Sequence, residues 1–231
     1  FTDSSSTGHT VTATGDVVHV APKMGTGMGV FDNNGILTVA DDPSLTLGGP
    51  FTVEAWVYFN AFGSSSYVFD KWTGSGNQRS WEYYYTHSST THLFMLSPDG
   101  TSSSENFSTT SGAFALNTWY HIAFARDSSN NFRFFINGTQ VGSTATNITS
   151  NAFDSTAALE LMSDVDGYMD ECRISNGVCR YTSNFTPPTA AFNDDKDTIW
   201  PCKEIFSKGS VVVFPSFLWH RVTPITSGER L

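Results

Sequence analysis

The sequence predicts an all-β protein, an antiparallel β-sandwich or jelly roll. Short segments rich in β-branched and aromatic residues recur along the chain, each bounded by clusters of Gly, Ser, Asn, Asp or Pro. No segment of any length shows the apolar spacing of a helix. Many short strands at near-regular spacing are typical of sandwiches and jelly rolls. The expected strands are 51–59, 66–72, 80–86, 92–97, 119–127, 132–138, 139–145, 158–163 and 168–175.

The first of these strands has the clearest pattern. In FTVEAWVYF two sets of residues alternate, as expected for a strand with two different faces. We expect Trp56, Trp119 and Ile174 to be buried, because each stands in a strongly apolar strand. One face of 51–59 carries Phe51, Val53, Ala55 and Val57, and the other carries Thr52, Glu54, Trp56 and Tyr58.

A tight hairpin is expected between the strands 132–138 and 139–145. Asn137 and Gly138 stand between them, and both residue types tolerate the positive φ of a type I′ turn.

The composition changes near residue 186. Three prolines and an acidic run follow in NFTPPTAAFNDDKDTIWPC, so the strands end and a connector begins. We therefore expect one sandwich over 1–192, a linker over 193–207 and an additional β segment over 208–231.

Composition and charge exclude several classes of partner. The net charge is −10, and no Lys/Arg cluster exists, so a nucleic-acid partner is not expected. The apolar runs fall short of the ~20 residues that span a bilayer, so no membrane segment is expected. The chain starts at Phe1 without a basic start or an apolar core region, so no signal peptide is visible.

Three cysteines, Cys172, Cys179 and Cys202, allow at most one disulfide bond. Cys172 and Cys179 are interpreted as small buried hydrophobic residues. A disulfide bond or a metal site is the alternative, although the Cys-x6-Cys spacing matches no zinc pattern.

Three segments in order carry a family resemblance: GGPFTVEAWVYF, NTWYHIAFARDSSNNFRFFINGTQVGS and DGYMDECRISNGVCRYTSNFTPPTAAF. Together they resemble laminin-G-like domains of the concanavalin A-like lectin/glucanase superfamily, in the form found in phage tail and bacterial surface proteins. The resemblance covers about 1–192 and implies a jelly-roll sandwich of two antiparallel sheets. It also implies a module that binds a glycan or a host-surface polymer, located on a virion or an extracellular surface within a larger multidomain or virion assembly.

Aromatic residues are the first candidates for the ligand site that this resemblance implies. Trp72, Trp81, Tyr83 and Tyr85 lie in the aromatic and Gly/Ser-rich stretch KWTGSGNQRSWEYYYTHSS. Exposed rings could stack on sugars, but aromatic residues of a strand are more often core residues, and both interpretations stay open. Trp72 borders the glycine loop, which favours its exposure.

A structural calcium ion is the second expectation. SDVDGYMDE places Asp164, Asp166, Asp170 and Glu171 close together, and hard cations prefer such oxygen ligands. A solvated acidic turn is the alternative. Asp170 is the preferred ligand, because related folds use an aspartate on this last strand to hold an ion.

Catalysis is not expected from this sandwich. Glycosidases on this fold carry a run of the type Glu-x-Asp-x-x-Glu, and the sequence has none. The main hypothesis is therefore a binding module.

The C-terminal stretch KGSVVVFPSFLWHRVTPITSGERL resembles the last part of iron- and 2-oxoglutarate-dependent dioxygenases of the prolyl-hydroxylase type. By this match His220 would bind Fe(II) and Arg230 would pair with 2-oxoglutarate. An ordinary apolar strand is the alternative. None of the other histidines begins a His-x-Asp/Glu pair, so the stretch is interpreted as an incomplete hydroxylase fragment fused to the module, without activity in this chain.

Overall fold

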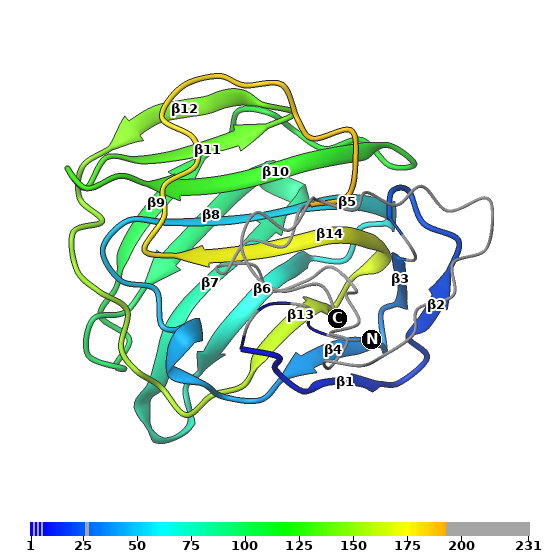
Figure 1. Cartoon of the computed structure of the whole chain (residues 1–231), viewed down its shortest axis with the longest axis horizontal. Helices are drawn as coiled ribbons and strands as arrows, with labels where there is room; N and C mark the ends of the chain where they lie inside the picture. The colour runs from blue at the N-terminus through cyan, green and yellow to red at the C-terminus, as the bar shows by residue number, and fades with distance from the viewer. Residues whose placement is uncertain (2, 4, 6, 26–27, 193–231) are drawn as a thin grey trace, which may run out of the picture.

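Two antiparallel sheets of seven strands each pack face to face in the computed structural model, which describes all residues except 2, 4, 6, 26–27 and 193–231 (Figure 1). In this part of the chain, no helix is long and apolar enough to cross a membrane. Sheet A has the order β1 (Val11–Thr14), β4 (Ile36–Val39), β13 (Leu159–Ser163), β6 (Ser65–Thr73), β7 (Gln78–Thr86), β8 (Thr91–Leu96) and β9 (Glu105–Thr109). Sheet B has the order β12 (Thr139–Ala145), β11 (Phe132–Ile136), β10 (Trp119–Arg126), β5 (Phe51–Ala61), β14 (Asp166–Asn176), β3 (Met28–Asp32) and β2 (Val18–Val20).

All nine strands expected from the sequence are present, and the predicted fold class is confirmed. Five further strands, β1 to β4 and β9, were not predicted. They are short and partly polar, such as VTAT in β1 and ENFST in β9, so their alternation is weak. Three short 3₁₀ helices also occur, at Pro43–Leu45, Ser75–Asn77 and His87–Ser89.

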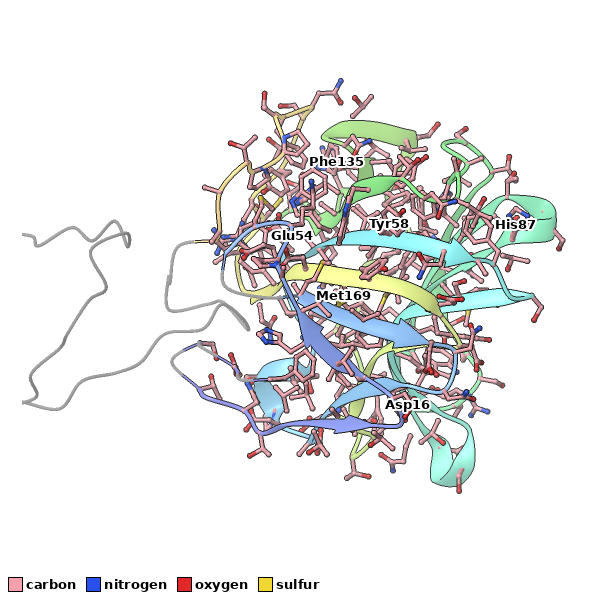
Figure 2. The ribbon with its side chains drawn as sticks, turned by 90° about the vertical axis from the view of Figure 1, so that its right-hand side faces the viewer. Asp16, Glu54, Tyr58, His87, Phe135 and Met169 are labelled. Carbon is pink, nitrogen blue, oxygen red and sulfur yellow. The ribbon has the colours of Figure 1, made fainter. Side chains whose placement is uncertain are left out.

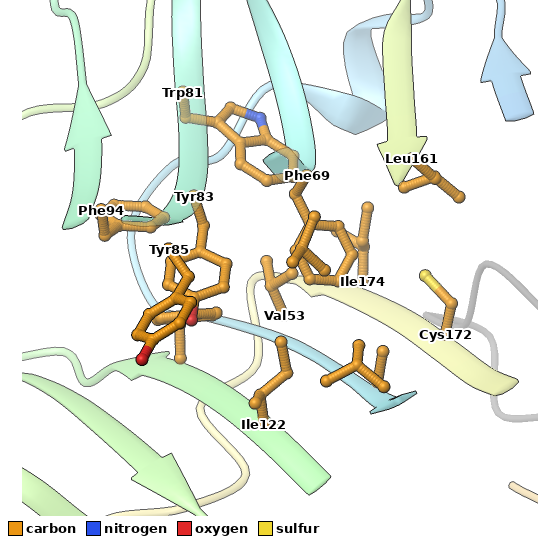
Figure 3. Packing of buried hydrophobic residues seen from close by; sticks show 14 of the residues in the cluster. Val53, Phe69, Trp81, Tyr83, Tyr85, Phe94, Ile122, Leu161, Cys172 and Ile174 are labelled. Atoms are coloured by element: carbon orange, nitrogen blue, oxygen red, sulfur yellow. The ribbon is translucent and has the colours of Figure 1, made fainter. Parts of the chain in front are cut away.

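The core lies between the two sheets and is rich in aromatic side chains (Figure 3). Sheet B contributes Val53, Ile122 and Ile174, and sheet A contributes residues such as Phe69 and Trp81. The indole Nε1 of Trp81 donates to the carbonyl oxygen of Leu45 at 2.8 Å, so this buried polar group is satisfied. Ile174 is buried, as predicted.

The segment 177–192, here called the strap, lies against the outer face of sheet B. Its residues Cys179, Tyr181 and Phe185 pack on a small second cluster formed by Ala123, Ala125 and Phe135. The strap therefore covers part of the outer face of β10 and β11.

The predicted hairpin explains how the strap is held. Asn137 and Gly138 have φ values of 50° and 75°, which confirms the expected pair of positive φ angles. The amide of Phe185 donates to the carbonyl oxygen of Gly138 at 2.8 Å. A Cβ atom on Gly138 would lie 1.9 Å from the carbonyl oxygen of Phe185, so glycine is required both by the turn and by the strap.

The predicted burial of Trp56 and Trp119 is wrong, because both side chains are partly exposed. Both stand on the outer face of sheet B, and the strap packs on other residues of this face. Figure 2 shows Glu54 and Tyr58 at different points along β5, with Glu54 toward the strap.

Candidate functional site

The aromatic stretch predicted to contact ligand divides between core and surface. Trp81, Tyr83 and Tyr85 are fully buried between the sheets, so they offer no surface to a ligand, and the ligand-binding prediction for Trp81 and Tyr83 is corrected to a packing role. Trp72 follows the buried Lys71 on β6 and is partly exposed, as its position beside the glycine loop suggested.

A different group of aromatic residues is exposed on sheet B. Trp56, Tyr58, Trp119 and Tyr168, here called the aromatic patch, come from three neighbouring strands and are all partly exposed. The ring centroid of Tyr58 lies 5.4 Å from that of Trp119 and 5.1 Å from that of Tyr168. The ring centroids of Trp119 and Tyr168 lie 6.2 Å apart, so Tyr58, Trp119 and Tyr168 form one continuous aromatic surface, and Trp56 is joined to it through Lys23.

Strand pairing explains why these rings meet. Tyr58 on β5 stands directly opposite Trp119 on β10 and Tyr168 on β14. Side chains of directly opposed residues point to the same face of a sheet and lie within contact distance. The inner-face neighbours of Tyr58, Val57 and Phe59, are buried in the core, so the alternation of β5 places Tyr58 on the outer face.

The segment before β3 borders the patch. The ammonium group of Lys23 lies 4.2 Å from the ring centroid of Trp56 and 5.4 Å from that of Trp119, which are cation–π distances. The amide of Met24 donates to Oδ2 of Asp170 at 2.8 Å, so the backbone is tied to β14 at this point. Burial raises the pKa of the Asp170 carboxyl, although the hydrogen bonds from Met24 and Glu171 act in the opposite direction.

The sequence analysis did not predict the patch because it placed Trp56 and Trp119 in the core on the apolar character of their strands. The alternation in 51–59 separates Trp56 and Tyr58 from Val53 and Val57, which was the available signal. Tyr168 stands in the strand 168–175 at a position that only the register of β14 against β5 relates to Tyr58.

The three aspartates predicted as calcium ligands lie at different places. Asp164 lines an open hollow at the rim with Asn33 and Tyr67, whereas Asp166 accepts a hydrogen bond from Asn60 at 2.8 Å. Both oxygens of Asp170 accept hydrogen bonds from backbone amides. Among the residues that the structure describes, no three His, Cys, Asp or Glu side chains are grouped so that they could hold a metal ion. Asp166 and Asp170 have separate hydrogen-bond partners, and a joint calcium site with Asp164 stays a prediction.

Three carboxyl groups that the sequence did not single out form a row on the outer face of sheet A. Asp70 on β6 stands directly opposite Glu160 on β13 and Glu82 on β7. Glu82 is only 4% exposed, and Oδ1 of Asp70 is buried without a hydrogen-bond partner. Burial and the charge of Glu160 raise the pKa of Asp70 to about 7, and burial and the charge of Asp70 raise the pKa of Glu82 to about 8.

A buried polar network fixes the strap to sheet B. Glu54 accepts hydrogen bonds from Arg173 at 2.8 Å and from the hydroxyl of Tyr181 at 2.9 Å, and His121 lies 3.2 Å away. Burial by itself would raise the pKa of Glu54, but the hydrogen bond with His121 and the charge of Arg173 outweigh it and lower this pKa. Because Tyr181 belongs to the strap, the network joins the strap to β5, β10 and β14.

The cysteines that the structure describes are free. Cys172 is buried in the core, as expected, and burial raises the pKa of its thiol. Cys179 is only partly buried, and it belongs to the strap and packs on the cluster of Ala123, Ala125 and Phe135. Cys202, His220 and Arg230 lie outside the described residues, as do the expected linker 193–207 and the segment 208–231.

Comparison with solved structures gives neighbours with low sequence identity. The binding domain of botulinum neurotoxin serotype G is 14% identical with a TM-score of 0.59, over 80% of this chain and 46% of that one. The serotype D ligand-binding domain in complex with N-acetylneuraminic acid is 10% identical with a TM-score of 0.58, over 80% and 45% of the two chains. The binding domain of paraclostridial mosquitocidal protein 1 is 11% identical with a TM-score of 0.58, over 78% and 46%.

These likenesses show the fold, and the chain spans less than half the length of each of these domains. A search of curated proteins finds no match. The family model described as the concanavalin A-like lectin/glucanases superfamily matches residues 31–180, which is more than half of the chain. The laminin-G-like match includes β5, β10 and β14, which carry the aromatic patch. The chain therefore belongs to the concanavalin A-like lectin/glucanase superfamily.

Proposed function

We propose that the chain is a carbohydrate-binding module and that the aromatic patch is its ligand surface. The observation that carries this proposal is the continuous surface of Tyr58, Trp119 and Tyr168, with Trp56 beside it, partly exposed on the outer face of sheet B. Soluble proteins seldom expose such grouped aromatic residues unless the surface binds something.

The composition of the patch favours a sugar. A pyranose ring presents C–H groups on its faces and hydroxyl groups at its edge, which suits an aromatic surface with polar neighbours. Tyr and Trp rings provide an apolar face together with a hydrogen-bonding group. The hydroxyl of Tyr58 lies 3.4 Å from Oδ1 of Asn117, and Nδ2 of Asn60 reaches Asp166, so amide and carboxylate groups stand beside the rings.

Structural neighbours give independent support for a glycan ligand. One is described in a complex with N-acetylneuraminic acid. Another is described in connection with cell entry that depends on two ganglioside molecules. These ligands belong to those proteins, and here they support only the ligand class.

The test compares Trp119→Ala with Trp72→Ala in a glycan-array or polysaccharide-binding experiment. We expect Trp119→Ala to weaken binding roughly tenfold or more, because removal of a central aromatic contact typically costs about 2 kcal/mol. Trp72 is the matched control, because it is also a partly exposed tryptophan but stands on sheet A. We expect Trp72→Ala to bind like the unmodified protein.

Loss of binding in Trp72→Ala with normal binding in Trp119→Ala would move the site to the glycine loop of sheet A. Absence of binding to every glycan tested would remove the proposed function.

We further propose that the module serves in a phage tail or surface adhesin, on a virion or an extracellular surface, as part of a larger assembly. The support is the resemblance of its motifs to laminin-G-like repeats of such proteins.

The second candidate function is a fragment of an Fe(II)- and 2-oxoglutarate-dependent hydroxylase fused to the module. It depends on His220 and Arg230, and it is tested by measuring 2-oxoglutarate turnover with Fe(II). Turnover that His220→Ala abolishes would support it.

We also propose a structural calcium ion bound through Asp170. The support is the acidic turn and the resemblance. It predicts a melting temperature that rises with calcium and falls with a chelator, because a ligand that binds the folded state stabilises it. Asp170→Asn should abolish this response. A melting temperature that does not change with calcium would exclude the ion.

A further inference from the structure

We propose that the aromatic patch is one end of a longer site that binds a neutral, extended polysaccharide along its side, with the sugar chain lying across the strands of sheet B. This inference rests on the proposed function and adds the form and charge of the ligand.

An apolar row crosses five neighbouring strands of sheet B. In register, Trp119 stands opposite Tyr58, Tyr58 opposite Tyr168, Tyr168 opposite Val30, and Val30 opposite Val18. We call these five residues the apolar row. Directly opposed residues point to the same face, so the row follows one line from β10 to β2.

Every member of the apolar row is accessible to solvent. Trp119, Tyr58, Tyr168 and Val30 are partly exposed, and Val18 is 51% exposed. Adjacent strands lie ~4.8 Å apart, so the four spacings of the row cover about 19 Å. One strand spacing is close to the length of a single pyranose unit in an extended chain, and the row can therefore contact several consecutive sugars.

A line of polar side chains runs beside the apolar row. Two positions from the row members Trp119, Tyr58, Tyr168 and Val30 stand Asn117, Asn60, Asp166 and Asp32, which we call the polar flank; Asn117 lies just before β10. Asn60 and Asp166 are hydrogen-bonded to each other, and Asp166 stands opposite Asp32, so members from neighbouring strands are adjacent. An apolar floor with amide and carboxylate groups along one side matches the C–H faces and edge hydroxyls of a sugar chain. A protein partner would not require this regular arrangement.

The segment with Lys23 and Met24 borders the opposite side of the row. It lies over Trp56 on β5 and Asp170 on β14, which are directly opposed on the outer face. Lys23 contacts the ring of Trp56, and the amide of Met24 donates to Asp170. The apolar row therefore has a different neighbour on each side, and a chain that follows the row is guided across the strands.

Charge favours a neutral polymer. The protein has a net charge of −10, and the polar flank contains Asp166 and Asp32. A polyanionic glycan would meet repulsion along the flank, whereas hydroxyl groups can donate hydrogen bonds to these carboxylates. Lys23 stands at the patch end of the site and does not offset two carboxylates further along.

The test is calorimetric titration of the full chain with neutral β-linked oligosaccharides, from chitin, cellulose and xylan, in lengths from the disaccharide to the hexasaccharide. We expect the affinity for the best of these series to rise with length over several sugars. Val18→Asp should weaken hexasaccharide binding roughly tenfold, or about 1.4 kcal/mol, and leave disaccharide binding at the aromatic end unchanged. Val18 is exposed, so this change leaves the core intact.

Leu93→Asp is the matched control, since Leu93 is a partly exposed aliphatic residue on the opposite sheet. It should bind all lengths normally. Affinity that does not depend on length, or a Val18→Asp protein that binds the hexasaccharide normally, would overturn the extended site while leaving the proposed function intact. Preferred binding of sulfated or uronic-acid polymers would overturn the neutral ligand.

Loss of binding to all glycans would instead remove the proposed function itself, and the inference with it. Concentration-dependent dimers that Val18→Asp disrupts, without any length-dependent sugar binding, would assign the apolar row to contact between two copies and would also overturn the inference.

Discussion

Glu54→Ala is expected to lower the free energy of unfolding by about 3–5 kcal/mol, the usual cost of removing one partner of a buried ion pair. Glu54 is fully buried and receives Arg173, the hydroxyl of Tyr181 and His121. Without its carboxylate, Arg173, Tyr181 and His121 would lose a buried partner. For a chain of this size the melting temperature should fall by roughly 10 °C.

The strap should respond first. Tyr181 is joined to the sheet through Glu54, and its ring stacks on Phe185 with a centroid distance of 3.6 Å. Hydrogen exchange should therefore show lost protection in the strap at the amide of Phe185, which bonds to Gly138.

Glu105→Ala provides the matched control. Glu105 also accepts several hydrogen bonds, from Thr149 and Ser150, but it is partly exposed to solvent. Its loss should therefore cost much less than the loss of Glu54. If both changes lowered the free energy of unfolding equally in urea denaturation, burial of the Glu54 network would add no stability beyond that of a partly exposed carboxylate.

The pH dependence of this network has a defined sign. The folded-state pKa of Glu54 is lowered from its ordinary value of 4.5. Its contribution to the free energy of unfolding is therefore fully present above about pH 4.5 and is lost as the pH falls below this value through the folded-state pKa. The Glu54 network is therefore a source of acid sensitivity.

The sequence was sufficient for the sandwich but not for the ligand surface. Alternation in strands such as 51–59 and 119–127 predicts which residues share a face, and this is enough for nine strands and the fold class. It does not predict which outer face is covered. The strap packs on Phe135 and Ala123 but leaves Trp56 and Trp119 partly exposed, so two residues predicted as core became the candidate site.

Long-range pairing explains the other differences. Aromatic or charged residues on both faces of β7 surround Trp81 and Tyr83 in the sequence. Only the packing of sheet A on sheet B shows that these two side chains lie in the core between the sheets. The acidic turn has carboxylates close in sequence, but Asp166 and Asp170 bond to different partners, Asn60 and Met24. The row of Glu160, Asp70 and Glu82 joins residues up to ninety positions apart, and register alone reveals it.

The unmodified protein is expected to lose stability as the pH rises from about 5 to 8.5, because of Asp70 and Glu82. Their folded-state pKa values of about 7 and about 8 lie above the ordinary values of 3.8 and 4.5. The folded state therefore holds protons that the unfolded state has released. Each such proton lowers the free energy of unfolding by at most about 1.4 kcal/mol for each pH unit, up to about pH 7 for Asp70 and about pH 8 for Glu82.

The surroundings of the pair explain this direction. Glu160 faces Asp70 from β13 as a like charge, and Tyr67 and Tyr84 stand beside the row on β6 and β7. Among the described groups, Arg79 on β7 is the cation that acts on Glu82, and the amide of Trp72 is the donor that acts on Asp70. These two influences lower the pKa values but do not outweigh burial and mutual repulsion.

Asp70→Asn should therefore stabilise the protein at pH 8.5 and reduce the decline between pH 5 and 8.5, because an amide occupies the same space without a charge. Urea denaturation at both pH values measures this effect, with Asp16→Asn at an exposed aspartate as the control. The stability that depends on Glu54 changes with pH only below about pH 4.5, so the two effects fall in separate pH ranges. If Asp70→Asn and Asp16→Asn gave the same pH dependence as the unmodified protein, Asp70 would not be a source of the decline in stability.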